Sequence, residues 1–261
     1  MKHFHGTPIG GQREQVAKFA KGRFLLVPFA RPEDLPIVAD VSRGFALDNS
    51  AFTVWKQGGK LDFEGVMEWY REWANHPRCD LLIIPDEIEG SENDNDKLLQ
   101  RFLKNATRQM ADKAAPVWHL HESLDRLRHL SRWRYLAIGS SGEFKTPGTE
   151  KWLLRMSEVM KTVCDDDGRP RTRIHGLRML SPAIIERYPF WSADSTNVAQ
   201  NANLLERFGN YKPPTQSQRC EVIASRIEAA QSPAVWKDSN PQQSFDFCID
   251  TNKSKEPNCD A

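Results

Sequence analysis

Short apolar segments alternate with amphipathic segments over residues 1–209, and this alternation constrains the fold more than any other feature. Most of the apolar segments are continuous runs, which is typical of parallel strands covered on both faces. Between them, apolar residues recur at helical spacing, as at Phe63, Val66, Met67, Tyr70 and Trp73. Eight segments are predicted as strands: 3–7, 24–29, 45–51, 81–88, 116–121, 135–140, 173–180 and 190–195.

Eight strands that alternate with helices close most simply as a (β/α)₈ TIM barrel of the α/β class. An open doubly wound sheet is the alternative, but the chain has no Gly-rich GxGxxG turn to favour it. We expect a catalytic barrel over residues 1–209, a C-terminal helical extension over 210–231 and an irregular tail over 232–261. The helices are predicted at 12–21, 63–73, 95–113, 123–131, 149–164, 183–187, 197–208 and 220–230, with a further helix opening at Pro32.

Composition narrows the possible partners and compartment. The 261 residues carry a formal net charge of +1, which gives no global attraction to nucleic acid. A local basic patch at Arg126, Arg128, Arg132 and Arg134 stays open. The five cysteines include no CxxC pair, so neither a disulfide framework nor a structural zinc site is indicated. No apolar run is long enough to span a membrane, and we expect a cytoplasmic protein.

Polar residues follow almost every predicted strand, where a barrel of this kind carries its active site. One strand-end Asp can be explained as a helix cap and one His as a core residue. Burying an unpaired polar group costs roughly 1–3 kcal/mol, so packing alone does not explain the whole set. The candidate residues are His3, His5, Asp48, Asp86, His119, His121, Glu122, Ser140, Ser141, His175 and Asp194.

Two chemistries fit these residues. The first is metal-dependent hydrolysis of the amidohydrolase type, because alternate residues of a strand share one face and so pair the imidazoles. Its metal ligands would be His3, His5, His119, His121, His175 and Asp194. The second is displacement at a sugar carbon, in which one carboxylate attacks and another group handles the proton. Asp48 and Asp194 could divide those two roles.

The order of four short motifs favours the second chemistry. They are 48–52 (DNSAF), 85–87 (PDE), 136–143 (LAIGSSGE) and 190–196 (FWSADST). In this order the chain resembles the tRNA-guanine transglycosylase superfamily. It is most similar to the 7-deazaguanine DNA-modification branch, the DpdA-like proteins of phages and bacteria. The resemblance covers roughly residues 45–201.

This resemblance implies roles for particular residues. Asp194 would be the nucleophile at C1′, and Asp48 would be the proton-handling acid/base. Asp86 would accept hydrogen bonds from N1–H and the exocyclic amine of a guanine-type base. The base would also contact Gly139, Ser140 and Ser141, with His119, His121, Glu122 and His175 lining the pocket. No cofactor and no metal are implied.

The resemblance also implies substrates and a place of action. The reaction would replace guanine with a 7-deazaguanine, such as 7-cyano-7-deazaguanine, in nucleic acid. DNA is favoured over tRNA, because the region after residue 209 lacks the cysteine-rich zinc site of the tRNA enzymes. A duplex would need its target nucleotide flipped out, and the near-neutral charge leaves room for a partner protein or a free nucleoside substrate. Phage-encoded copies would act in the host cytoplasm. A non-catalytic nucleobase-binding barrel is the third alternative.

Overall fold

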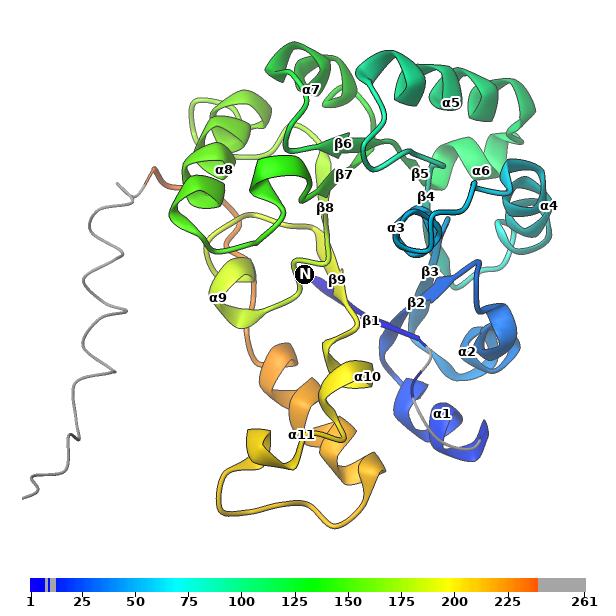
Figure 1. Cartoon of the computed structure of the whole chain (residues 1–261), viewed down its shortest axis with the longest axis vertical. Helices are drawn as coiled ribbons and strands as arrows, with labels where there is room; N and C mark the ends of the chain where they lie inside the picture. Colours follow the sequence, from blue (N-terminus) through cyan, green and yellow to red (C-terminus); the bar gives the residue numbers. More distant parts are fainter. Residues whose placement is uncertain (8, 10–12, 239–261) are drawn as a thin grey trace, which may run out of the picture.

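The computed structural model describes residues 1–7, 9 and 13–238. In this part of the chain nine strands form one parallel sheet, in the order β5-β4-β3-β2-β1-β9-β8-β7-β6. Helices surround the strands (Figure 1), and the predicted α/β barrel is confirmed. The strands are β1 (Lys2–Gly6), β2 (Phe24–Pro28), β3 (Gly44–Asp48), β4 (Cys79–Ile83), β5 (Ala114–Ala115), β6 (Val117–His119), β7 (Tyr135–Gly139), β8 (Arg173–Leu177) and β9 (Ser192–Ser195).

A proline separates β5 from β6, so the strand predicted at 116–121 corresponds to β6, and the two-residue β5 before the proline was not predicted. Pro116 has no N–H and cannot donate to a strand ladder. Its carbonyl still accepts from the Ala137 N–H at 2.9 Å, and the Ala115 carbonyl accepts from the Ile84 N–H at 3.0 Å. β5 therefore pairs with β4, and β6 pairs with β7. The two ends of the sheet meet within residues 114–119, so the nine strands fill eight positions of a nearly closed barrel.

The helices begin where the sequence provides caps. Side chains of Asp62, Ser91, Thr107, Ser123 and Thr149 each accept a backbone N–H of the first turn that follows them. The α-helices are α1 (Arg13–Ala20), α2 (Leu35–Val41), α3 (Ala51–Lys56), α4 (Phe63–Trp73), α5 (Glu92–Asn105), α6 (Arg108–Lys113), α7 (Leu124–Leu130), α8 (Glu150–Val163), α9 (Pro182–Ile185), α10 (Asn197–Asn201) and α11 (Gln216–Glu228). Three 3₁₀ turns, Pro32–Asp34, Gly142–Phe144 and Leu205–Phe208, complete the set.

Several predicted boundaries are wrong, among them the strand at 81–88, which ends at Ile83, and the helix at 197–208, which ends at Asn201. Two others are wrong for clear local reasons. The helix expected at 95–113 is interrupted at Ala106, which is extended, and Thr107 then caps α6 as a new helix. The strand expected at 45–51 ends at Asp48, because Ser50 adopts a left-handed backbone with φ 65°. That turn starts the short helix α3, which the sequence did not predict.

The core has two layers. A small inner cluster fills the barrel and includes Phe4, Leu26 and Ala137. A larger outer cluster packs the strands against the helices and includes Trp118 and Trp152, both fully buried. Because both strand faces are covered, the strands read as continuous apolar runs.

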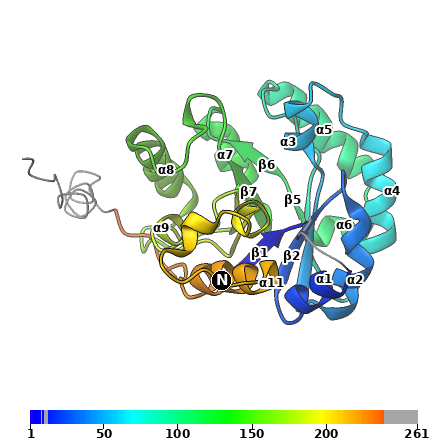
Figure 2. The same cartoon turned by 60° about the horizontal axis from the view of Figure 1, so that its bottom comes forward.

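The helix after the barrel packs on β1 and α1. Figure 2 shows α11 passing beneath β1 beside α1. His3 Nε2 hydrogen-bonds to the Ala230 carbonyl at 2.8 Å, and His5 Nε2 lies 3.0 Å from Glu228 Oε1. Beyond α11, the Trp236 N–H donates to the Gly168 carbonyl at 2.8 Å. The rest of the predicted irregular tail, residues 239–261, lies outside the described residues.

Candidate functional site

Three carboxylates from three different strands lie close together at the C-terminal mouth of the barrel. Asp48 ends β3, Asp86 follows β4, and Asp194 lies near the end of β9. Burial, together with the nearby charges of Asp194 and Asp86, raises the pKa of Asp48 from 3.8 to about 7. Asp86 and Asp194 are only 6% and 5% exposed, whereas Asp48 is partly exposed. The shared mouth expected from the sequence is therefore present.

Two backbone N–H groups hold two of these carboxylates. The Ser50 N–H donates to Asp48 Oδ2 at 3.0 Å, and the Arg178 N–H donates to Asp194 Oδ1 at 3.0 Å. Both donors have a left-handed backbone, with φ 65° at Ser50 and 58° at Arg178. Strained backbone of this kind concentrates at functional sites, where the surrounding structure holds it in place.

Asp86 is held by two side chains of the protein. Asn49 Nδ2 donates to Asp86 Oδ1 at 2.8 Å, and His119 Nε2 lies 2.9 Å from Asp86 Oδ2. Because a carboxylate only accepts, the second contact places a proton on Nε2 of His119. The other ring nitrogen, Nδ1, is buried with no hydrogen-bond partner in the described part of the chain. One lone pair on each oxygen of Asp86 is left for a ligand.

Asp194 has an imidazole behind it. His175 is fully buried, and its Nε2 lies 3.3 Å from Asp194 Oδ1. Its Nδ1 lies 2.7 Å from the Ser192 hydroxyl. The Ser192 contact holds the ring below the mouth. Nε2 has no hydrogen-bond partner in the described residues, so its closeness to Asp194 is a contact and not a hydrogen bond. Because His175 is fully buried, it lies behind Asp194 and not on the exposed wall of the mouth, where the sequence suggested it.

The segment after β7 forms one wall of the mouth. Gly139 lies under His119, and a Cβ at this position would come within 3.0 Å of Nδ1. Ser140 Oγ accepts from Trp152 Nε1 at 2.9 Å, and Ser141 Oγ lies 2.6 Å from His121 Nδ1. Both hydroxyls are therefore engaged within the protein. The His121 ring stacks on the His119 ring with centroids 5.8 Å apart.

Glu122 does not face the mouth. Its carboxylate accepts from Arg126 Nη1 at 2.6 Å, from Asn95 Nδ2 at 3.1 Å and from the His119 N–H at 2.9 Å. Its side chain is fully buried. The expected pocket-lining role is replaced by a structural one, because this buried ion pair fixes the backbone of His119.

The six donors of the metal-site alternative are not brought together. His3 and His5 share a strand face as expected, but it is the outer face, against α11. His121 lies beyond the end of β6 and is exposed, so it does not extend the strand face of His119. Among the described residues, no group of three or more His, Cys, Asp or Glu side chains is arranged to hold a metal ion.

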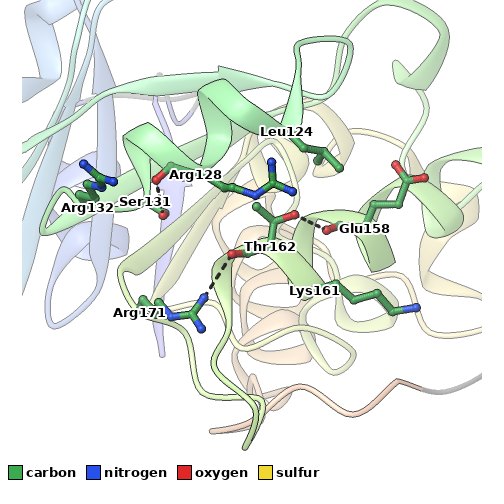
Figure 3. A pocket seen from close by; sticks show the side chains of 8 residues that line it. All are labelled: Leu124, Arg128, Ser131, Arg132, Glu158, Lys161, Thr162 and Arg171. Atoms are coloured by element: carbon green, nitrogen blue, oxygen red, sulfur yellow. Dashed lines mark hydrogen bonds between the residues drawn. The ribbon is translucent and has the colours of Figure 1, made fainter.

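A basic pocket lies away from the mouth, between α7 and α8 (Figure 3). It has a volume of about 700 Å³ and is lined by Arg128, Arg132, Lys161 and Arg171, with Glu158 as its acidic member. Arg132 precedes β7, which places it near the amino-terminal ends of the strands. Arg126 is instead buried in its ion pair with Glu122, so the basic patch considered from the sequence contains only part of its expected members.

Sequence reasoning missed several residues of the site. Asn49 and Ser50 lie in the DNSAF motif, yet no pattern reveals that one binds Asp86 and the other has a left-handed backbone. Arg178 and Ser192 lie inside the strands predicted at 173–180 and 190–195, with no distinguishing signal. Polarity next to a strand end is the one cue that could have included them.

Comparisons with known proteins support the fold alone. No protein-family model matches the chain, and no curated protein sequence matches it. A crystal structure assigned as a fructose-1,6-biphosphate aldolase from Coccidioides immitis is similar in structure, with a TM-score of 0.50 and 12% sequence identity. The match covers 97% of this chain and 90% of that one. Within the described residues, no helix is long and apolar enough to cross a membrane.

Proposed function

We propose that this barrel is a base-exchange glycosyltransferase that replaces guanine with a 7-deazaguanine in nucleic acid, DNA in preference to tRNA. The observation that carries the proposal is the pairing of two unlike carboxylates in one mouth. Asp48 has a pKa raised to about 7 and can both give and take a proton near neutral pH. Asp194 is held by the Arg178 N–H through Oδ1, which leaves Oδ2 for attack.

The reaction divides into two displacements at the same carbon. Asp194 Oδ2 attacks C1′ while the bond from C1′ to N9 breaks, and the electron pair of that bond goes to the departing guanine. Protonated Asp48 supplies the proton that neutralises the leaving base. The incoming 7-deazaguanine gives a proton to ionised Asp48, and its nitrogen then displaces Asp194 from C1′. Asp48 thus returns to its starting state, and no proton is consumed overall.

Asp86 and its neighbours would bind the base. The remaining lone pairs of Asp86 suit two adjacent donors such as N1–H and the exocyclic amine of a guanine-type base. Asn49 and His119 hold the carboxylate in one orientation, which lowers the entropy lost on binding. The absence of a side chain at Gly139 lets the His119 ring pack directly against the backbone of β7, which helps to hold the imidazole beside Asp86.

Replacement of Asp194 by Asn tests the nucleophile. We expect no exchange of guanine for 7-cyano-7-deazaguanine in a DNA oligonucleotide, with the thermal unfolding curve retained. The matched control is Asp125→Asn on α7, whose side chain is 90% exposed; it should exchange at the wild-type rate. Retained turnover in Asp194→Asn would remove the proposed nucleophile. Tight base binding by the wild type without any exchange would instead support a non-catalytic nucleobase-binding barrel.

A further inference from the structure

Arg178 combines a strained backbone with a side chain at the mouth of the barrel. In the described part of the chain, Ser50 and Arg178 are the two non-glycine residues with positive φ. The left-handed conformation at Arg178 aims its N–H at Asp194. Glycine would adopt this conformation at lower cost, because it has no Cβ to clash with the backbone. The backbone role alone therefore gives no reason for an arginine here.

The arginine side chain reaches across the mouth to the opposite strand end. Its guanidinium carbon lies 3.9 Å from the centroid of the Phe52 ring, in the short helix that follows Asp48. Stacking of this kind restricts the guanidinium without using its N–H donors. Arg178 is exposed, and no carboxylate in the described residues pairs with it. The guanidinium is thus oriented, and its donors are free.

The position of this cation fits the electrostatics of a polyanionic substrate. Asp48, Asp86 and Asp194 concentrate negative charge in the mouth, which repels an approaching phosphodiester backbone. The net charge of +1 offers no compensating attraction from the whole molecule. The backbone N–H of Arg178 donates to Asp194, so the guanidinium of the same residue stays within one side-chain length of the proposed nucleophile.

We propose that Arg178 binds a phosphate of the nucleic-acid backbone next to the nucleotide whose C1′ faces Asp194. A guanidinium can donate two parallel hydrogen bonds to a phosphate, and the stack on Phe52 sets the plane of that fork. This inference rests on the proposed function, because it names the feature that distinguishes a nucleic-acid strand from a free base. The phosphate would therefore bind at the mouth of the barrel and not in the basic pocket between α7 and α8.

Arg178→Gly provides the sharpest test, because glycine keeps the left-handed backbone and removes only the side chain. We would measure the affinity of the full chain for a guanine-containing single-stranded DNA oligonucleotide across a range of salt concentrations. The dissociation constant should rise roughly tenfold at low salt. The slope of log affinity against log salt should fall by about 0.7, the value for one lost phosphate contact on a single strand. The melting temperature should stay close to that of the wild type.

Arg132→Gln is the matched control, because it removes one exposed positive charge from the basic pocket. The inference predicts an unchanged salt slope for this variant. An unchanged slope in Arg178→Gly, an equal loss in both variants, or wild-type binding without salt dependence would each overturn it. Failure of the proposed reaction gives a different pattern, in which DNA binding depends on Arg178 but no base exchange occurs.

Discussion

Replacing Asp48 with Asn should stabilise the folded protein, and the gain should grow with pH. Asn has nearly the same shape, and its Oδ1 can still accept the Ser50 N–H. The change removes a carboxylate whose pKa rises from 3.8 to about 7 on folding, mainly because of burial and then because of Asp194 and Asp86. Because the pKa is raised on folding, ionisation of Asp48 lowers the free energy of unfolding of the protein.

The sign and size of this stability change follow from the pKa of Asp48 in the unfolded chain, 3.8, and in the folded chain, about 7. Between pH 4 and 7 the unfolded chain releases this proton while the folded chain retains it, so stability falls as pH rises through that window and is flat above it. A shift of about 3 units corresponds to a ceiling of about 4 kcal/mol at pH 8, at 1.36 kcal/mol per unit. Asp48 is partly exposed, so solvent screening should reduce the gain to about 2 kcal/mol.

Urea unfolding at pH 5 and at pH 8 measures this effect. The stability advantage of Asp48→Asn over the wild type should be about 1–2 kcal/mol larger at pH 8 than at pH 5. Asp125→Asn, which removes an exposed carboxylate, should show no such pH-dependent gap. Equal advantages at the two pH values would refute the claim that burial and neighbouring carboxylates raise the pKa of Asp48.

Two further predictions concern the wall of the mouth and its support. Gly139→Ala should weaken the binding of 7-cyano-7-deazaguanine roughly tenfold by calorimetry, because its methyl group would lie 3.0 Å from His119 Nδ1 and displace the ring from Asp86; wild-type affinity would show that base binding does not depend on the position of His119. Glu122→Gln should lower the free energy of unfolding by about 2 kcal/mol, because the buried Arg126 would lose its fully buried carboxylate and keep only the largely exposed Asp96, 2.9 Å from Nε. A loss below 1 kcal/mol would mean that Arg126 is adequately paired without Glu122.

Local sequence signals located the strands well but not always their ends. Continuous apolar runs marked the strand segments, and polar residues after them marked the mouth. The sheet is interrupted at Pro116 because proline has no N–H to donate. The helix is interrupted at Ala106 because the Thr107 side chain caps a new helix. The early end of β3 depends on a left-handed residue, Ser50, whose side chain gives little sign of that conformation.

The placement of the histidines illustrates the limit most clearly. A strand period of two showed that His3 and His5 share one face, but both faces of a barrel strand are apolar. The inner face turned out to carry Phe4, and both histidines pack outward against the residues around α11. Sequence pattern alone could not select between the two faces.

The chain by itself determined an alternation of strands and helices and the acids that follow particular strands, because those depend on local spacing and composition. Only the tertiary structure decided which groups meet. Closure of the barrel brings Asp48, Asp86 and Asp194 together, and burial followed by repulsion from the other two carboxylates raises the pKa of Asp48. The contacts of Asp86 with His119 and of Asp194 with His175 join residues on different strands, so they depend on strand order and register, which no local pattern specifies.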